Sequence, residues 1–258
     1  MTGDLGRFAR GAARMAGRAE RELPALVERL AGFCELSGEE RALDAGAGAG
    51  TYALALAPSV REVVGLDPVP ELLAEARRLA AERGAGNVTF VKGDATALPF
   101  AAGSFDLAAC ARTLHHVRRP ELVVAELTRV VRPGGKVLLV DQLASPDPLE
   151  ALARDRLERL RDASHERTLS DQDVRGLLEA NWLVLRRSRV DREDIEAESF
   201  LDVAACEGEA RRAFLAEAQR LVGRGERAGI ALRLAGDGYA MTFEVGWYLA
   251  VKPATPAT

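Results

Sequence analysis

Carboxylates and glycines follow three apolar segments of this 258-residue chain. Residues 43–57 read LDAGAGAGTYALALA, so Asp44 stands just before three alternating glycines and a run of small residues. Asp67 closes the segment EVVGLD, and Asp94 follows NVTFVKG. In an open parallel sheet, ligands bind at the carboxyl ends of the strands. The pattern therefore predicts a ligand site built from sequence-distant parts, although each aspartate taken alone is equally typical of a helix N-cap.

The spacing of the glycines bears on which nucleotide could bind. A dinucleotide loop has the pattern G-x-G-x-x-G, whereas this loop reads G-x-G-x-G, with Thr51 where the third glycine would stand. Asp67 lies roughly 20 residues beyond Gly46, a distance that suits a contact with ribose hydroxyls. Asp94 could accept a hydrogen bond from an exocyclic amine such as that of adenine. Together these features favour an adenosine ligand without a pyrophosphate.

The elements that must position these residues alternate between strand and helix patterns. Apolar strand segments are predicted at 41–45, 62–66, 87–92, 105–110 and 136–140, and helices include 50–57, 70–83 and 120–131. Strands that are apolar on both faces and alternate with helices are typical of a parallel sheet covered by helices. The fold class is therefore α/β, a doubly wound sheet.

We expect one domain over residues 1–258. Residues 1–38 would form N-terminal helices on the flank of the domain, the second of them starting at Pro24. The cofactor-binding core would span 39–145, the helical lid and substrate region 146–180 and 192–225, and the last strands 182–190 and 239–251.

Composition excludes several classes of protein. The net charge of −4 argues against a general polyanion binder, so we expect no nucleic-acid partner. No segment approaches the roughly 18 consecutive apolar residues that span a bilayer, so no membrane association is expected. The three cysteines and three histidines are not spaced as metal ligands. The cysteines are dispersed and odd in number, which suits a reducing, cytoplasmic location. The sequence is compatible with a homodimer but does not determine the oligomeric state.

Four ordered motifs resemble those of the class I S-adenosylmethionine-dependent methyltransferases. They read LDAGAGAG, VVGLD, VKGDATALPFAAGSFDLAACARTLHHV and RVVRPGGKVLLVD. Within that class they are most similar to the group that includes the ubiquinone/menaquinone-biosynthesis methyltransferases. The resemblance implies S-adenosyl-L-methionine as cofactor, methyl transfer to a small-molecule acceptor, and a Rossmann-like sheet of seven strands whose last strand, 239–251, is antiparallel.

The resemblance also implies roles for individual residues. The cofactor-binding residues would be Asp44, Gly46, Ala47, Gly48, Gly50, Asp67, Pro68, Asp94, Ala95, Ala111 and Arg112. The segment 44–50 would wrap the methionine moiety, Asp67 would hold the ribose, and Pro68, Asp94 and Ala95 would contact adenine. Ala111 and Arg112 would lie near the sulfonium.

On the acceptor side, the resemblance places His116 opposite the transferred methyl group and His165 over the acceptor pocket, both as candidate bases. A base is needed only for an acceptor that must lose its proton early. Relatives often have an N-terminal tyrosine that closes over the cofactor, but Met15 and Gly17 stand where it would be expected. Two other functions therefore stay open: an NAD(P)-dependent oxidoreductase and a non-catalytic adenosine-ligand-binding protein.

Overall fold

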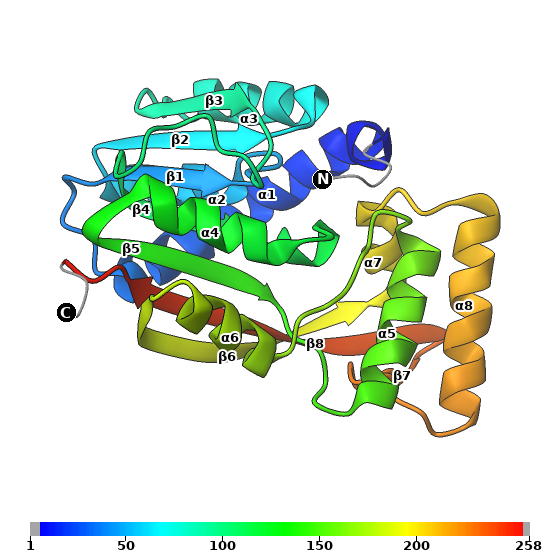
Figure 1. Cartoon of the computed structure of the whole chain (residues 1–258). Helices are drawn as coiled ribbons and strands as arrows, with labels where there is room; N and C mark the ends of the chain where they lie inside the picture. Colours follow the sequence, from blue (N-terminus) through cyan, green and yellow to red (C-terminus); the bar gives the residue numbers. More distant parts are fainter. Residues whose placement is uncertain (1–5, 255–258) are drawn as a thin grey trace.

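A mixed sheet organises the chain, which we describe from a computed structural model over residues 6–254. Its main path has the order β3-β2-β1-β4-β5-β8-β6 (Figure 1). The parallel strands are β1 (Arg41–Ala45), β2 (Glu62–Asp67), β3 (Val88–Lys92), β4 (Phe105–Ala111) and β5 (Val131–Gln142). Strand β8 (Gly238–Val251) runs antiparallel to both β5 and β6 (Val184–Glu196). The predicted seven strands with an antiparallel last strand are confirmed, and the short β7 (Arg233–Ala235) is an unpredicted addition that pairs with β8.

Helices cover both faces of this sheet. The first face packs against α1 (Gly6–Cys34), α2 (Thr51–Leu56) and α3 (Pro70–Glu82), and the second against α4 (Pro120–Val130) and α6 (Asp171–Ala180) (Figure 1). Two single-turn helices, η1 (Ala57–Ser59) and η2 (Leu114–His116), lie in the connections. Successive residues of β1 point to opposite layers, because Ala42 belongs to the first core and Leu43 to the second. This explains why the strands are apolar throughout.

The N-terminal segment forms one helix, so the prediction of a second helix from Pro24 is wrong. Helix α1 continues through Pro24. Its buried stripe, which includes Ala19, Leu23, Leu26 and Leu30, keeps helical spacing on both sides of the proline. Pro24 itself is exposed, so the carbonyl group that loses its helical partner can bind water instead. Burial of the stripe outweighs the local preference of proline for a helix start.

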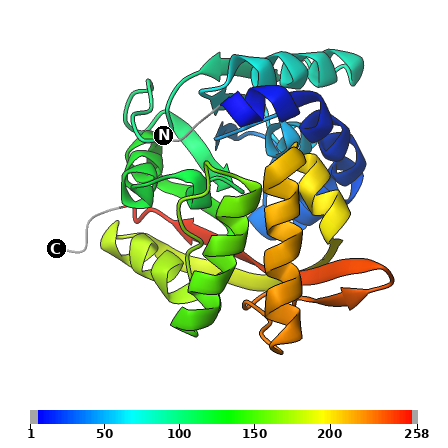
Figure 2. The ribbon, with the colours of Figure 1, turned by 90° about the vertical axis from the view of Figure 1, so that its right-hand side faces the viewer.

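A second group of elements lies beyond the carboxyl ends of the parallel strands (Figure 2). It comprises α5 (Pro148–Arg161), α7 (Ala197–Val203), α8 (Gly208–Gly223) and the extended ends of β6 and β8. The helical region predicted from residue 192 becomes helical only at Ala197, because residues 190–196 continue β6 by pairing with residues 240–246 of β8. These elements share their own core, which includes Phe200, Phe214 and Phe243. Helix α6 instead packs on the main sheet and does not join this group.

Candidate cofactor and acceptor site

A cavity of about 470 Å³ opens between the sheet and the group of α5, α7 and α8. The glycine loop after β1 forms its floor, and η2 after β4 forms one wall. One side of α1 forms the opposite wall, and residues of α7, β6 and β8 close the far end. Seven of the residues predicted from the sequence line it: Asp44, Gly46, Ala47, Gly48, Ala111, Arg112 and His116.

The glycine loop is held to β2 by its own backbone. The amides of Gly46 and Ala47 donate to the Leu66 carbonyl at 2.7 and 2.9 Å, and the amide of Gly48 donates to Asp67 Oδ2 at 2.9 Å. Gly48 has a φ of +54°, and a Cβ added there would meet only Met15 Cε, at 3.9 Å. The backbone at Gly48 therefore faces open space, which a ligand could approach closely.

Glycine is required at positions 46 and 50, on either side of Gly48, for a different reason. A Cβ on Gly46 would stand 2.4 Å from Thr113 Oγ1, and one on Gly50 would stand 3.1 Å from both Ala76 Cβ and Phe90 Cζ. Both residues also have positive φ, +84° and +87°. Packing and backbone conformation thus explain Gly46 and Gly50, whereas the prediction of close ligand approach applies best to Gly48.

Asp44 is a buried carboxylate without a visible partner. It is 1% exposed and lines the cavity, and neither carboxyl oxygen accepts a well-formed hydrogen bond from any described residue, although the backbone amide of Ala53 is near enough to lower the pKa of this carboxyl slightly. Burial raises the pKa of Asp44 to about 7. A buried charge costs several kcal/mol unless it is paired. A cationic group of a ligand would supply the missing partner, so the site fits a ligand with an ammonium group next to the glycine loop.

The adenosine-side residues lie outside the lining of this cavity. Asp67 is buried, and its carboxylate accepts hydrogen bonds from the amides of Gly48 and Val69, both at 2.9 Å. Asp94 Oδ1 accepts from the amide and the hydroxyl of Thr96, at 2.9 and 2.8 Å. Pro68, Ala95 and Gly50 are likewise absent from the lining among the described residues. Their contacts with ribose and adenine remain predictions.

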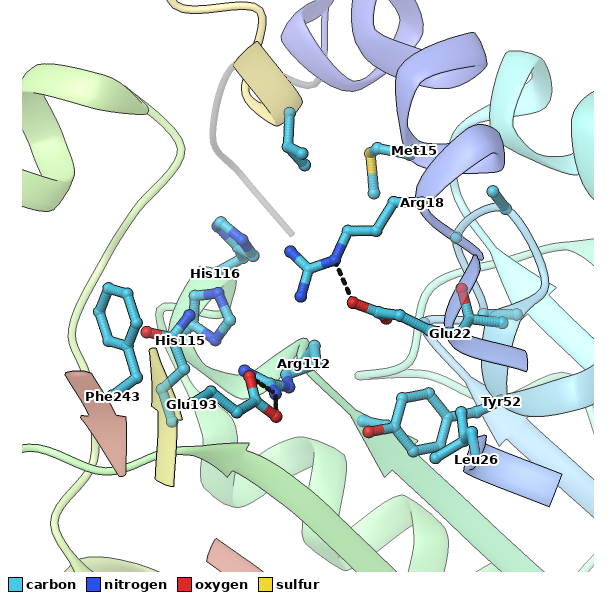
Figure 3. A pocket seen from close by; sticks show the side chains of 18 of the residues that line it. Met15, Arg18, Glu22, Leu26, Tyr52, Arg112, His115, His116, Glu193 and Phe243 are labelled. Atoms are coloured by element: carbon cyan, nitrogen blue, oxygen red, sulfur yellow. Dashed lines mark hydrogen bonds and ion pairs between the residues drawn. The ribbon is translucent and has the colours of Figure 1, made fainter. Parts of the chain in front are cut away.

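Helix α1 supplies functional candidates that the sequence did not identify. Met15, Arg18 and Glu22 recur at helical spacing on the side of α1 that faces the cavity. Arg18 Nε donates to Glu22 Oε1 at 2.6 Å, and its guanidinium extends into the cavity (Figure 3). Met15 Cε lies above the glycine loop, 3.9 Å from the position of a Cβ added to Gly48. The sequence does contain a pattern that could have identified these three residues, because they form a stripe on α1 next to its apolar stripe.

Arg112 links the end of β4 to β6. Its Nη2 donates to both carboxylate oxygens of Glu193, at 2.6 and 2.7 Å (Figure 3). Its amide donates to the Val140 carbonyl at 2.7 Å, and its φ of +53° is rare for a residue other than glycine. Such backbone strain is concentrated at functional sites. Glu193 was not predicted as a site residue, because it comes to the cavity only through the extension of β6.

The three histidines of the chain lie together. The ring centroids of His115 and His116 are 4.1 Å apart, and that of His165 lies 5.8 Å from His115. His115 and His116 line the cavity, but His165 does not. His165 is buried behind them, with Nε2 2.8 Å from Asp155 Oδ1. The expectation that His165 overhangs the acceptor is therefore corrected: Asp155 turns its ring into the interior.

Within residues 6–254, no group of three or more His, Cys, Asp or Glu side chains is arranged to hold a metal ion. None of the helices in this described part is both long and apolar enough to cross a membrane.

Known proteins are similar to this chain in the segment that contains the glycine loop and the end of β4. Residues 43–139 match a family described as a methyltransferase domain. The uncharacterized methyltransferase YcgJ of Bacillus subtilis is 41% identical over 149 residues, or 58% of this chain and 59% of that protein. Its crystal structure superposes with a TM-score of 0.82, covering 89% of this chain and 98% of the other at 28% identity. A demethylmenaquinone methyltransferase of Clavibacter sepedonicus is 41% identical over 110 residues, or 43% of this chain and 44% of that protein. In sequence, the chain spans about half the length of the curated relatives it matches.

Proposed function

We propose that this chain is a class I S-adenosylmethionine-dependent methyltransferase, which binds S-adenosylmethionine beside the glycine loop and transfers its methyl group to a small-molecule acceptor in the cavity. The match of residues 43–139 to a methyltransferase domain and the similarity to YcgJ support this proposal. The observation that carries the proposal is the unpartnered, buried carboxylate of Asp44 beside an open glycine loop. The α-ammonium group of the cofactor is the partner that this carboxylate lacks.

The methionine end of the cofactor is assigned to four residues. Asp44 binds the ammonium group, the backbone of Ala47 and Gly48 lies against the chain of the methionine moiety, and Arg18 binds its carboxylate. Arg18 is suited to this role because only its Nε is engaged with Glu22, which leaves the terminal nitrogens free to donate. Met15, above Gly48, keeps water from this end.

The remaining cofactor contacts follow the sequence prediction. Asp67 is assigned to the ribose hydroxyls, and Pro68, Asp94 and Ala95 to adenine. Asp67 can hold ribose while it fixes the loop, because each carboxylate oxygen can accept more than one hydrogen bond. Ala111 and Arg112 are assigned to the region of the sulfonium, where both line the cavity.

The chemistry requires little beyond positioning and exclusion of water. When bound, the cofactor supplies an electrophilic methyl group on a positively charged sulfur. The walls formed by α1, α7 and the ends of β6 and β8 would hold the acceptor in line with it. The positive charge on sulfur is neutralised as the methyl group moves to the acceptor. A site with few water molecules therefore favours the transition state over the charged sulfonium.

Calorimetric titration with S-adenosylhomocysteine and with NAD tests this proposal against an oxidoreductase. We expect binding of S-adenosylhomocysteine and loss of that binding in Asp44→Asn, whereas binding of NAD alone would overturn the assignment. A non-catalytic binder would take up the labelled cofactor without passing its methyl group to any compound of a small-metabolite extract. Several relatives are named demethylmenaquinone methyltransferases, but they match this chain over less than half of its length, so we assign the acceptor only as a small molecule.

We also propose a cytoplasmic protein without a nucleic-acid partner. The three cysteines are free and buried, as suits a reducing compartment, and the net charge is −4. A homodimer remains a prediction from the sequence. Light scattering after size exclusion would measure the mass in solution, and a mass of one chain would exclude the dimer.

A further inference from the structure

We propose that His115, oriented by Asp141, is the base that takes the proton of the acceptor, and that the acceptor carries an ionisable hydroxyl group on an apolar, ring-sized body. This inference rests on the proposed methyl transfer. It differs from the sequence prediction, which named His116 and His165 as candidate bases, and it assigns a role to Asp141, the last residue of the fourth motif, for which the resemblance implied none.

Asp141 fixes which nitrogen of His115 carries the hydrogen. His115 Nδ1 lies 2.6 Å from Asp141 Oδ1, which also accepts from the amide of Gln142 at 2.8 Å. Burial by itself would raise the pKa of Asp141, but His115 and these hydrogen bonds hold it below its usual range, so the carboxylate is ionised. An ionised carboxylate only accepts, so Nδ1 donates and Nε2 keeps its lone pair.

The lone pair of His115 is available to a ligand. His115 lines the cavity, and among residues 6–254 its Nε2 has no hydrogen-bond partner. A lone pair that faces a cavity, on a ring held by a carboxylate, is the arrangement of a general base. Figure 3 shows the ring on the cavity wall, across from the side chains of Met15 and Arg18 on α1.

His116 is the weaker candidate for the same role. Its Nδ1 lies 3.2 Å from Ser164 Oγ and 3.3 Å from the Ser164 carbonyl, and the serine hydroxyl donates to Asp162 at 2.6 Å. Its Nδ1 lies 3.9 Å from Asp162 Oδ2, too far for a hydrogen bond, and Asp162 is already paired with Arg7. Burial, together with the neighbouring His115 and Arg7, lowers the pKa of His116 well below its usual value. His116 thus stays neutral and does not compete for the proton.

The charged groups around His115 come from several elements. Asp141 lies on β5, His116 on η2, and Glu158 on α5, and His165 lies between α5 and α6. Among the described residues, Asp141 is the one that forms a hydrogen bond with the His115 ring, and His165 is itself paired with Asp155.

The residues at the far end of the cavity indicate which kind of acceptor would fit. Phe8, Phe200 and Phe243 line it, which suits an apolar ring. The guanidinium of Arg7 stacks 4.0 Å from the Phe8 ring and that of Arg161 lies 3.9 Å from the Phe200 ring. Six arginines and three carboxylates line the described cavity: Arg7, Arg18, Arg21, Arg29, Arg112, Arg161, Glu22, Asp44 and Glu193. Three of these arginines, Arg7, Arg29 and Arg161, are paired with carboxylates just outside the lining, so the arginines offer an oxyanion N–H donors rather than a net positive charge.

The step balances without a further reactant. The hydroxyl oxygen of the acceptor forms a bond to the methyl carbon as the bond from that carbon to sulfur breaks. The electron pair of the broken bond goes to sulfur, which becomes a neutral thioether. The hydroxyl proton goes to His115 Nε2 and afterwards to water, so the products are the methyl ether, S-adenosylhomocysteine and one proton.

The proposal can be tested with 4-nitrophenol, whose phenolate absorbs visible light while the neutral phenol does not. At about pH 6, we expect the complex of the wild-type protein with S-adenosylhomocysteine to bind this probe as phenolate. His115→Asn should abolish the phenolate signal, and Asp141→Asn should weaken it at least about tenfold, because the wrong tautomer of His115 is then favoured. Asp106→Asn, a carboxylate at the other end of β4, is the matched control and should behave as wild type.

A second measurement needs no variant. Nitrogen NMR of the wild-type histidines should show His115 with hydrogen on Nδ1 in the complex with S-adenosylhomocysteine, and doubly protonated once 4-nitrophenol binds. A hydrogen on Nε2, binding of the neutral phenol, or failure of the complex to bind the phenol would each overturn the proposal while methyl transfer to another acceptor stands. Failure to bind S-adenosylhomocysteine would instead overturn the proposed function itself.

Discussion

Replacing Asp44 with asparagine separates the charge of this carboxylate from its size. The carboxylate is buried and unpartnered, and its pKa is about 7 because of burial. If binding needs the ionised form, the dissociation constant of S-adenosylhomocysteine rises as the pH falls through 7. A pKa of 7 predicts roughly eightfold weaker binding at pH 6 than at pH 7.5, or about 1.3 kcal/mol. The loss of a hydrogen bond between charged groups costs about 1.5–3 kcal/mol, so Asp44→Asn should bind roughly 10- to 150-fold more weakly at pH 7.5.

The same substitution should stabilise the protein without ligand. The pKa of Asp44 is raised on folding, from 3.8 to about 7, so the ionised form disfavours the folded state. This penalty is absent below the pKa of the unfolded chain, grows as the pH rises from about 4 to 7, and amounts to ~4 kcal/mol at most above that range. Denaturation by urea should therefore show a gain for Asp44→Asn that is larger at pH 7.5 than at pH 5.

Calorimetry of S-adenosylhomocysteine binding across pH 6–7.5, repeated in buffers of different ionisation enthalpy, measures both the affinity and the proton release. Wild type should release about half a proton at pH 7, because binding ionises the half-protonated Asp44. Asp44→Asn should show a flat profile and no such release. Asp106→Asn, on a half-exposed carboxylate paired with Arg132, should retain the wild-type profile. Wild-type affinity in Asp44→Asn, or an unchanged pH dependence, would refute the reasoning.

Three further predictions concern the walls of the cavity. Gly48→Val should weaken S-adenosylhomocysteine binding at least about tenfold in calorimetry. Gly84 has a similar positive φ, and a Cβ added there would have no atom within 4 Å, so the control Gly84→Val should lower stability but not affinity. Equal affinities of the two variants would contradict the role of the loop. Met15→Ala should weaken binding severalfold, because it uncovers the loop to water, and an unchanged dissociation constant would show that Met15 is no cover. Glu193→Gln should lower the free energy of unfolding by about 1–2 kcal/mol in urea denaturation, since Arg112 loses its charged partner in a half-buried pair; no loss would count against this link between β4 and β6.

Local sequence was sufficient for the parallel half of the fold. Each strand from β1 to β5 is an apolar run that ends in a polar or glycine residue, so its position could be predicted within one or two residues at most ends. The later part was less accurate because its strands depend on partners distant in sequence. Residues 190–196 carry the charges of an exposed helix, yet they pair with 240–246 and extend β6. Pro24 was misjudged for a related reason, since the buried stripe of α1 outweighs the preference of a single residue.

The residues of the candidate site also fall into two groups, those that contiguous motifs predict and those that only the folded structure identifies. The glycine loop with Asp44, and the end of β4, are contiguous motifs, and the structure brings them to one cavity. Arg18 and Glu193 come from α1 and β6, outside the motifs, and only tertiary packing places them in the cavity. Asp141 ends the fourth motif, but only the packing of β5 against η2 shows that it contacts His115. His115 and His116 illustrate the limit most clearly. Adjacent residues on a single turn cannot be distinguished from sequence, whereas a carboxylate 2.6 Å from one ring separates them.

The distribution of charge in the cavity explains how one site can hold a cationic cofactor among arginines. The carboxylate at the cofactor end, Asp44, lies beside the glycine loop without a partner among the described residues, whereas Arg7 and Arg161 lie at the acceptor end against Phe8 and Phe200. Arg7 and Arg161 are each paired with a buried carboxylate, Asp162 and Glu158, so the carboxylate of Asp44 is the charge that orients the ammonium group, and the guanidinium groups at the other end serve as donors to an oxyanion. A cationic acceptor would face the sulfonium, and in a cavity with few water molecules this repulsion is not screened. The same polarity that binds the cofactor in one orientation thus selects an acceptor that ionises by losing a proton, and it requires a base between the two ends, where His115 lies.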